Sequence, residues 1–176
     1  MVILDLKLYG IYGFEDFEIN FTYPKKIVNS IIEDEHLTGR KNFRYKKAII
    51  LMGANATGKT SLARALHGIF TLFEFGFTND LIDMATKEKS SFTIDFVNED
   101  YTLRRFEGII DINNLGFETN EYTAYIGIND SYEVCVEKLK KVGNDRSKVF
   151  LTDPCTKRSI TVFLIPTQRN AAIQKR

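Results

Sequence analysis

The sequence has little of what marks secreted, fibrous or polyanion-coating proteins. It contains two cysteines, three prolines and no tryptophan, and its 24 lysines and arginines are balanced by 23 aspartates and glutamates. A net charge of +1 excludes a chain that coats nucleic acid through its overall charge. Three prolines and eleven glycines among 176 residues exclude collagen-like and low-complexity classes. The remaining composition, 44% hydrophobic and 12% aromatic, predicts one globular domain.

The sequence also lacks a recognisable targeting signal and a membrane span. Residues 1–10 have no basic segment followed by the apolar run of a secretory signal. The longest apolar runs, Ala48–Met52 and Val162–Pro166, are far shorter than the roughly 18 residues of a spanning helix. We therefore expect a cytoplasmic protein without a membrane partner.

Cysteine and histidine are too few and too widely spaced to predict a metal site. Cys135 and Cys155 lie twenty residues apart, and His36 and His67 have no partner at ligand spacing. We expect two reduced thiols, with a disulfide as the alternative, and structural or surface roles for both histidines.

Alternating patterns predict several strands. Residues 3–21 alternate apolar and polar side chains around two glycines, which predicts a bent hairpin or two short strands. A hairpin is predicted over residues 91–106 and another over residues 122–136. The second arm of the latter also fits a helix, because residues 133–142 have helical periodicity.

Two helices are predicted after residue 60. Apolar residues recur at i, i+4, i+7 and i+11 over residues 62–73, which is one face of an amphipathic helix. A second, shorter helix is predicted over residues 80–87, with Asn79 and Asp80 as its cap. Ser159–Pro166 is predicted as a late strand. Together these elements predict an α/β fold with a large antiparallel share.

One motif carries chemistry. The segment from Gly53 to Thr60, Gly-Ala-Asn-Ala-Thr-Gly-Lys-Thr, is a full match to the phosphate-binding loop pattern G-x-x-x-x-G-K-[ST]. Ala48–Met52 directly before it has the pattern of a strand buried on both faces, and the predicted helix follows it. The predicted nucleotide-binding residues are Gly53, Ala54, Asn55, Ala56, Thr57, Gly58, Lys59, Thr60 and Ser61.

The residue types in this motif suit phosphate binding. Gly53 and Gly58 let the backbone turn tightly and approach phosphate without a Cβ in the way. Successive N–H groups then form an anion-binding nest at the positive end of the helix. Lys59 supplies charge for the β- and γ-phosphates, and Thr60 supplies a hydroxyl for Mg²⁺. Ser61 is placed to reach the α-phosphate.

The sequence does not reveal the rest of a hydrolytic site. Hydrolysis needs an acidic residue at the end of a buried strand to hold Mg²⁺, and a group that orients water. Asp83, Asp95 and Asp111 do not follow such a strand, so we expect ordinary surface carboxylates at all three. The catalytic residues therefore stay unknown at this point.

Three segments carry a resemblance to a known family. Met52–Leu66 resembles the phosphate-binding loop and following helix of ABC-type ATPases of the RecF, SMC and OLD group, and especially the AAA-domain proteins of the OLD-like type. Asn55 between the glycines is the discriminating residue. Leu6–Phe21 is similar to the family's opening strands, and Phe92–Phe106 to its antiparallel subdomain. The resemblance implies a P-loop NTPase fold, an ABC-ATPase-like first lobe with a mixed core sheet, a P-loop helix and an antiparallel β subdomain.

The same resemblance implies ATP and Mg²⁺ as ligands. It also implies a second ATPase subunit, because members of this family bind ATP between two subunits. Gln168 resembles the family's Mg²⁺- and water-binding glutamine, whereas Tyr12 stands about where many members have a basic residue. A Leu-Ser-x-Gly signature and a Walker B strand are not found. Residues 1–176 are therefore expected to be a single ATPase lobe, the N-terminal part of a longer ATPase domain.

We therefore expect a Mg-ATP-binding lobe of an ATPase, with little or no hydrolysis as an isolated chain. Two alternatives stay open: a small self-standing P-loop kinase, and a nucleotide-switched DNA-binding module with DNA or a nuclease as partner. The second alternative would use a basic cluster that also holds Phe43 and Tyr45. The members of this cluster are Arg40, Lys41, Arg44, Lys46 and Lys47.

Overall fold

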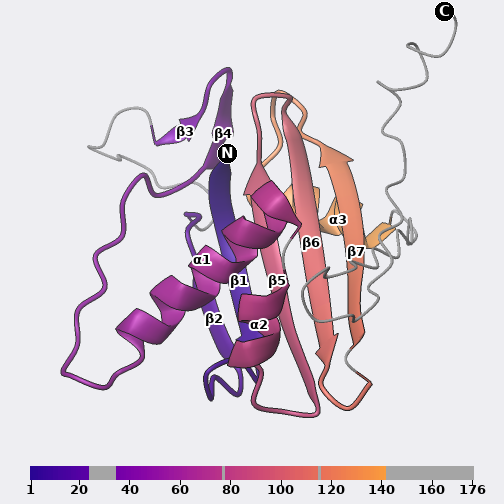
Figure 1. The fold of residues 1–176 in the computed structure, drawn as a ribbon. Helices are drawn as coiled ribbons and strands as arrows, with labels where there is room; N and C mark the ends of the chain where they lie inside the picture. The colour runs from indigo at the N-terminus through magenta and orange to yellow at the C-terminus, as the bar shows by residue number, and fades with distance from the viewer. Residues whose placement is uncertain (24–34, 77, 115, 142–176) are drawn as a thin grey trace, which may run out of the picture.

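The computed structural model describes residues 1–23, 35–76, 78–114 and 116–141. Its centre is a five-stranded sheet in the order β2-β1-β5-β6-β7, in which every neighbouring pair is antiparallel (Figure 1). The strands are β1 (Val2–Tyr9), β2 (Phe17–Asn20), β5 (Lys89–Val97), β6 (Thr102–Asp111) and β7 (Gly116–Tyr125). The fold of the described residues is thus mixed α/β with an antiparallel sheet.

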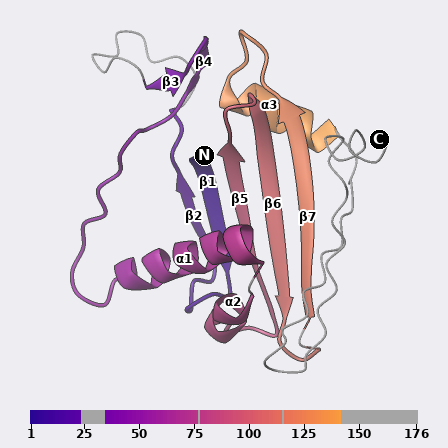
Figure 2. The same ribbon diagram turned by 45° about the horizontal axis from the view of Figure 1, so that its top comes forward.

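Helices cover both faces of this sheet. Helices α1 (Lys59–Phe75) and α2 (Asn79–Met84) lie across one face, and α3 (Tyr132–Lys141) lies on the other (Figures 1 and 2). A small hairpin of β3 (His36–Leu37) and β4 (Arg40–Arg44) extends beyond one end of the sheet. None of the helices in the described ranges is long and apolar enough to cross a bilayer.

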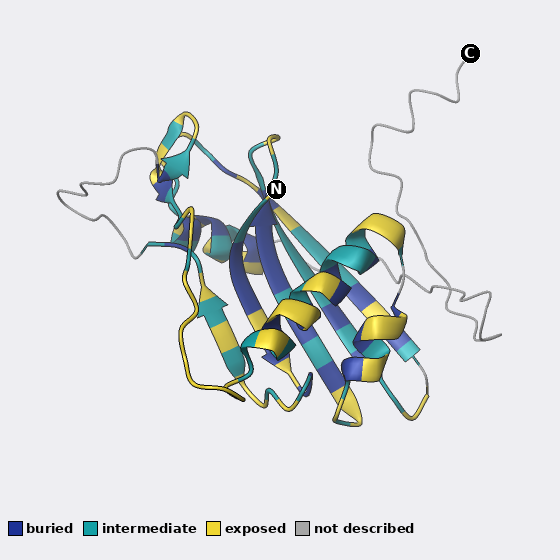
Figure 3. Ribbon diagram, turned by 60° about the vertical axis from the view of Figure 1, so that its left-hand side comes forward, coloured by how far each residue is buried: buried dark blue, intermediate teal, exposed yellow. Residues whose placement is uncertain are grey.

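Two hydrophobic clusters hold these layers together. Beneath α1 and α2, Leu6, Phe92 and Ile94 of the sheet pack with Ile69 and other buried side chains. The cluster beneath α3 contains Leu139 and the sheet residue Leu103. The buried residues lie along the strands where the helices cross them (Figure 3), as expected for elements that each have one apolar face.

The start of β1 departs from simple alternation. The pairing of β1 with β5 shifts register between Ile3 and Asp5, and such a shift changes which side chains face each side of a sheet. Leu4 belongs to the cluster beneath α3, whereas Leu6 and Leu8 belong to the one beneath α1. The shift therefore places two successive residues, the apolar Leu4 and the acidic Asp5, on the side of the sheet that faces α3.

Several predicted elements are confirmed. Residues 3–21 contain two paired strands, β1 and β2, and the hairpin predicted over 91–106 is the pair β5 and β6. The amphipathic pattern of residues 62–73 lies within α1. The short helix α2 is also present, over Asn79–Met84. Its N-cap residue is Thr78, so the predicted cap at Asn79 and Asp80 is wrong by one residue.

The second predicted hairpin, over residues 122–136, is wrong. Strand β7 ends at Tyr125 and pairs with β6, and Tyr132–Lys141 is a helix. Its buried residues Tyr132, Cys135 and Leu139 follow helical spacing, so the alternative helix is confirmed. Cys135 is a free, buried cysteine; burial and then Asp130 raise the pKa of its thiol to about 11.

The strand predicted over Ala48–Met52 is also wrong. The segment is irregular, and its side chains are open to solvent, with Ile50 83% and Met52 88% exposed. A strand buried on both faces needs a neighbour at its edge and a covering layer on each side. No described strand lies beside this segment, so the mixed core sheet is not found in the described part of the chain. Ser159–Pro166 and Gln168 lie outside the described residues.

Candidate phosphate-binding site

The predicted phosphate-binding loop leads directly into α1. Gly58 is the residue before the helix, and its backbone is left-handed with φ 85°. No described side chain caps this end, and the first turn holds no acidic residue. The first N–H groups of a helix have no partner within the helix and carry partial positive charge. The start of α1 therefore has N–H groups that no described side chain caps.

Two residues of the loop have a left-handed backbone conformation. Ala56 has φ 64° and Gly58 has φ 85°, so both residues adopt the left-handed conformation. Left-handed residues among right-handed ones turn successive N–H groups toward a common concave side, which is how backbone nests bind anions. Ala56 adopts this conformation at a cost of about 1–2 kcal/mol. Strain of this kind concentrates at ligand-binding loops.

Lys59 reaches back across the loop from the first residue of α1. Its ammonium donates hydrogen bonds to Gly53 O at 2.7 Å, to Ala54 O at 2.7 Å and to Thr57 Oγ1 at 3.1 Å. The Thr57 hydroxyl in turn donates to Ala54 O at 2.9 Å. The positive charge therefore lies at the centre of the loop, held by carbonyl oxygens that a phosphate group would replace as acceptors.

The loop is shaped by glycine at its first position as well. A Cβ built on Gly53 would lie 2.8 Å from Thr57 Oγ1, so a larger residue there would displace the hydroxyl that orders the loop. The hydroxyl residues Thr60 and Ser61 both lie in the first turn of α1, Thr60 exposed and Ser61 half-buried. These backbone, ammonium and hydroxyl groups fit a nucleotide phosphate with its Mg²⁺.

The predicted Mg²⁺ ligands are only partly placed by the structure. Thr60 lies at the loop, whereas Gln168 lies outside the described residues. Within the described part of the chain, no group of three or more histidine, cysteine, aspartate or glutamate residues could hold a metal. Protein-bound Mg²⁺ commonly takes one or two protein ligands and the substrate phosphates, which is consistent with Thr60 as a ligand.

A side chain that the motif does not include contacts the loop. Gly58 is so close to Phe14 that an added Cβ would lie 3.2 Å from Cε1 and Cζ of its ring. Phe14 belongs to a tight corner between β1 and β2, in which Gly10 N donates to Phe14 O at 2.6 Å. The corner is fixed to α2 by a hydrogen bond from Tyr12 N to Met84 O at 2.9 Å. The family resemblance drew attention to Tyr12 in this corner, whereas Phe14, which contacts the loop, was not predicted.

The contact predicts the effect of adding a methyl group at Gly58. Gly58→Ala is expected to weaken binding of Mg-ATP, because alanine is strained at φ 85° and its Cβ pushes on Phe14. Unfolding in urea should show that the free energy of unfolding falls by roughly 1–3 kcal/mol.

Gly13→Ala is the matched control. Gly13 lies next to Phe14 in the corner between β1 and β2, has φ 78°, and has nothing within 4 Å of an added Cβ. Equal losses in both variants would show that the Phe14 contact has no part.

The basic cluster is largely used within the fold. Arg40 donates from Nε to Ile126 O at 3.0 Å and its guanidinium lies 4.4 Å from the ring centre of Tyr101. Arg44 lies over the ring of Tyr23 at 5.7 Å. Phe43, which could have stacked on a base, is fully buried. The exposed cations of the cluster are Lys41 and Lys47.

Asp95, expected as a surface carboxylate, is fully buried instead, with 0% of its surface exposed. Both its oxygens accept hydrogen bonds from Arg105 at 2.7 Å, and Tyr132 Oη donates to Oδ2 at 2.6 Å. These bonds raise the pKa of Arg105, and burial followed by the charge of Asp95 raises the pKa of Tyr132. Asp83 is exposed, as expected, and Asp111 is half-buried.

The sequence matches no protein-family model, and comparison with the curated proteins finds no match.

Proposed function

We propose that this chain binds Mg-ATP through Gly53–Thr60, as the phosphate-binding lobe of a P-loop ATPase similar to the OLD, RecF and SMC group. The observation that carries this proposal is the position of Lys59. Its ammonium lies inside a loop with two left-handed residues, at the uncapped start of a helix of 17 residues. A positive charge, open N–H groups and a helix N-terminus together favour a multiply charged phosphate over a neutral ligand.

Each group has a distinct role in this proposal. The loop N–H groups bind the β-phosphate, and Lys59 exchanges its contacts with Gly53 O and Ala54 O for the β- and γ-phosphates. Thr60 contributes its hydroxyl to Mg²⁺, and Ser61 contributes its hydroxyl to the α-phosphate. The bound Mg²⁺ would neutralise charge that develops on the phosphates. Phe14 packs against Gly58, where an added Cβ would lie 3.2 Å from its ring.

We further propose that turnover requires groups from elsewhere, because the sequence shows no acidic residue at the end of a buried strand that would hold Mg²⁺. A second ATPase subunit that faces the loop would supply them. The P-loop NTPase fold and the family assignment are part of the same proposal, supported by Asn55 and the helix that follows the motif. The kinase and DNA-binding alternatives gain no specific support, since Arg40 and Arg44 are engaged within the fold.

Calorimetric titration of the chain with Mg-ATP tests the proposal. We expect saturable binding of one nucleotide, competition by inorganic pyrophosphate, and little phosphate release over hours. Titration with Mg-GTP tests the preference for the base, because all of the proposed contacts are to phosphates and Mg²⁺. The preference for ATP is implied only by the family resemblance. Absence of binding at millimolar Mg-ATP would contradict the proposed site. Rapid phosphate release by the pure chain would contradict only the need for a second subunit.

A further inference from the structure

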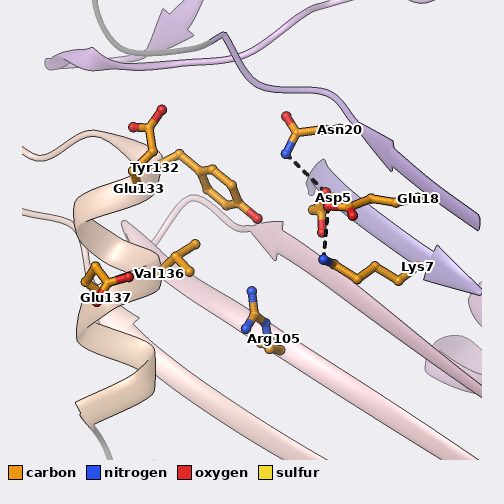
Figure 4. A pocket seen from close by; sticks show the side chains of 9 residues that line it. All are labelled: Asp5, Lys7, Glu18, Asn20, Arg105, Tyr132, Glu133, Val136 and Glu137. Atoms are coloured by element: carbon orange, nitrogen blue, oxygen red, sulfur yellow. Dashed lines mark hydrogen bonds and ion pairs between the residues drawn. The ribbon is translucent and has the colours of Figure 1, made fainter. Parts of the chain in front are cut away.

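A polar cavity lies between the sheet and α3, on the face opposite to the phosphate-binding loop (Figure 4). Its volume is about 300 Å³, which is at the lower end of the range for small-molecule sites. β1, β2 and β6 form one wall, and α3 forms the other. The lining residues are Asp5, Lys7, Glu18, Asn20, Arg105, Tyr132, Glu133, Val136 and Glu137.

The two cations of the cavity are already paired. Lys7 Nζ lies 2.9 Å from Glu18 Oε1, and Arg105 donates both of its bonds to the buried Asp95. Four carboxylates line the cavity. Glu18 is paired with Lys7, and Glu137 is paired with Lys140, whose Nζ lies 2.7 Å from Glu137 Oε1. Glu133 and Glu137 stand at the rim on α3 (Figure 4). The lining carboxylates outside these ion pairs are Asp5 and Glu133, so the charge left over in the lining is negative.

Asp5 is the most deeply buried of these carboxylates. Its side chain faces the cavity but the residue is only 2% exposed, and its single hydrogen bond comes from Asn20 Nδ2 at 3.1 Å. Burial, followed by the charge of Asp95, raises the pKa of the Asp5 carboxyl to about 6, although the charge of Lys7 opposes this shift. A carboxylate can accept about four hydrogen bonds. Burying one with a single neutral donor is costly, and a cation with several donors would remove that cost.

We propose that this cavity binds an aliphatic diamine or polyamine, with one ammonium at Asp5. An ammonium brings three donors and a positive charge to the buried carboxylate. The side chains of Val136 and Tyr132 extend from α3 toward Asp5 (Figure 4). They offer an apolar wall for a methylene chain. Glu133 at the rim receives the second ammonium, because Glu137, one helical turn further along α3, is already paired with Lys140.

A compact metal ion fits the cavity less well. The described residues include no group of three or more carboxylate, histidine or cysteine ligands arranged for a metal. The ammonium of Lys7 also lines the cavity and would repel a dication placed beside Asp5 more strongly than a singly charged ammonium. In a diamine the two charges are separated by a chain, so each can meet a carboxylate on a different wall.

Calorimetric titration with putrescine, at constant ionic strength, tests this site. We expect binding at pH 7.5, weaker binding of n-butylamine because it lacks the second ammonium, and at least tenfold weaker binding of putrescine to Asp5→Asn. Asp5→Asn keeps the size of the side chain and removes its charge. Val136→Lys places an ammonium of the protein in the cavity and should also abolish binding. Glu99→Gln changes an exposed carboxylate outside the cavity and should leave binding unchanged.

The dependence on pH gives a second readout. The groups around Asp5 are Lys7 of β1, Glu18 of β2, Asp95 of β5, Arg105 of β6, and Tyr132, Glu133 and Glu137 of α3. Because the pKa of Asp5 is raised to about 6, the carboxyl is mostly protonated at pH 5 and ionised at pH 7.5. An ammonium prefers the ionised form, so putrescine should bind roughly tenfold more weakly at pH 5. This change should be much smaller in Asp5→Asn.

Four results would overturn the proposal. They are no binding at millimolar putrescine, equal binding of n-butylamine, an equal loss in Glu99→Gln, or displacement of putrescine by MgCl₂ but not by NaCl of the same ionic strength. Asp5 is outside the phosphate-binding loop, so Asp5→Asn should bind Mg-ATP as the unchanged chain does. The diamine site and the proposed nucleotide site can therefore fail independently.

Discussion

Replacing Arg105 with leucine is expected to destabilise the fold by about 3–5 kcal/mol. Asp95 is fully buried and receives two of its three side-chain hydrogen bonds from Arg105. Without the guanidinium, the carboxylate keeps only the bond from Tyr132 and has no opposite charge beside it. An unpaired buried charge is among the largest single penalties that a substitution can produce.

The neighbouring arginine provides the matched control. Arg104 lies on the same strand and pairs with Asp100 at 2.7 Å and Glu121 at 3.2 Å, but these partners are far more exposed than Asp95. Arg104→Leu is therefore expected to cost only about 1 kcal/mol. Urea unfolding of both variants, followed by circular dichroism, measures the difference.

Replacing both members of the buried pair, with Asp95→Leu and Arg105→Leu in one chain, should recover much of the stability lost in Arg105→Leu. Equal destabilisation by Arg104→Leu and Arg105→Leu would show that burial of Asp95 is not the cause.

Replacing Lys59 with methionine is expected to weaken Mg-ATP binding by roughly 10- to 100-fold, since a hydrogen bond to a charged group contributes about 1.5–3 kcal/mol. The substitution removes the charge aimed at the phosphates. It also removes the contacts to Gly53 O, Ala54 O and Thr57 Oγ1 that order the loop. The affinity is measured by calorimetry, with circular dichroism to check that the fold is retained.

The control for this substitution lies on the same helix. Arg64 is exposed on α1, so Arg64→Met makes the same change of net charge away from the loop. It should change the affinity for Mg-ATP little, particularly at physiological salt, where exposed charges are screened over about 8 Å. A loss of affinity as large as that of Lys59→Met would mean that net charge, rather than the loop, governs binding.

Most of the local structure follows from short-range patterns. The strands β1, β5 and β6 and the helix α1 lie where alternation and helical periodicity predicted them, because each pattern depends on residues less than about five positions apart. The loop was also found from the sequence, because it is contiguous and its glycines, lysine and hydroxyl residue have fixed spacing. Residues 122–136 were ambiguous for the same reason, since a short apolar pattern fits a strand arm as well as a helix start.

The failures concern residues whose surroundings come from distant parts of the chain. Ala48–Met52 has the composition of a buried strand, yet burial requires neighbouring elements, and no described strand is placed beside it. Asp95 alternates along β5 like any surface residue. It is buried because it pairs with Arg105, which lies opposite on β6, and accepts a hydrogen bond from Tyr132 of α3. No local pattern contains that information.

The sequence by itself therefore determined the phosphate-binding motif, the helix that follows it and the antiparallel strands on either side, since these depend on spacing along the chain. Only the tertiary structure decided that Phe14 supports Gly58, that Asp95 is a buried ion-pair partner, and that Asp5 faces a cavity beneath α3. Each of these depends on contacts between separate elements of the fold, such as Tyr132 of α3 with Asp95 of β5. Burial and charge pairing are properties of the folded arrangement, in which such residues become neighbours.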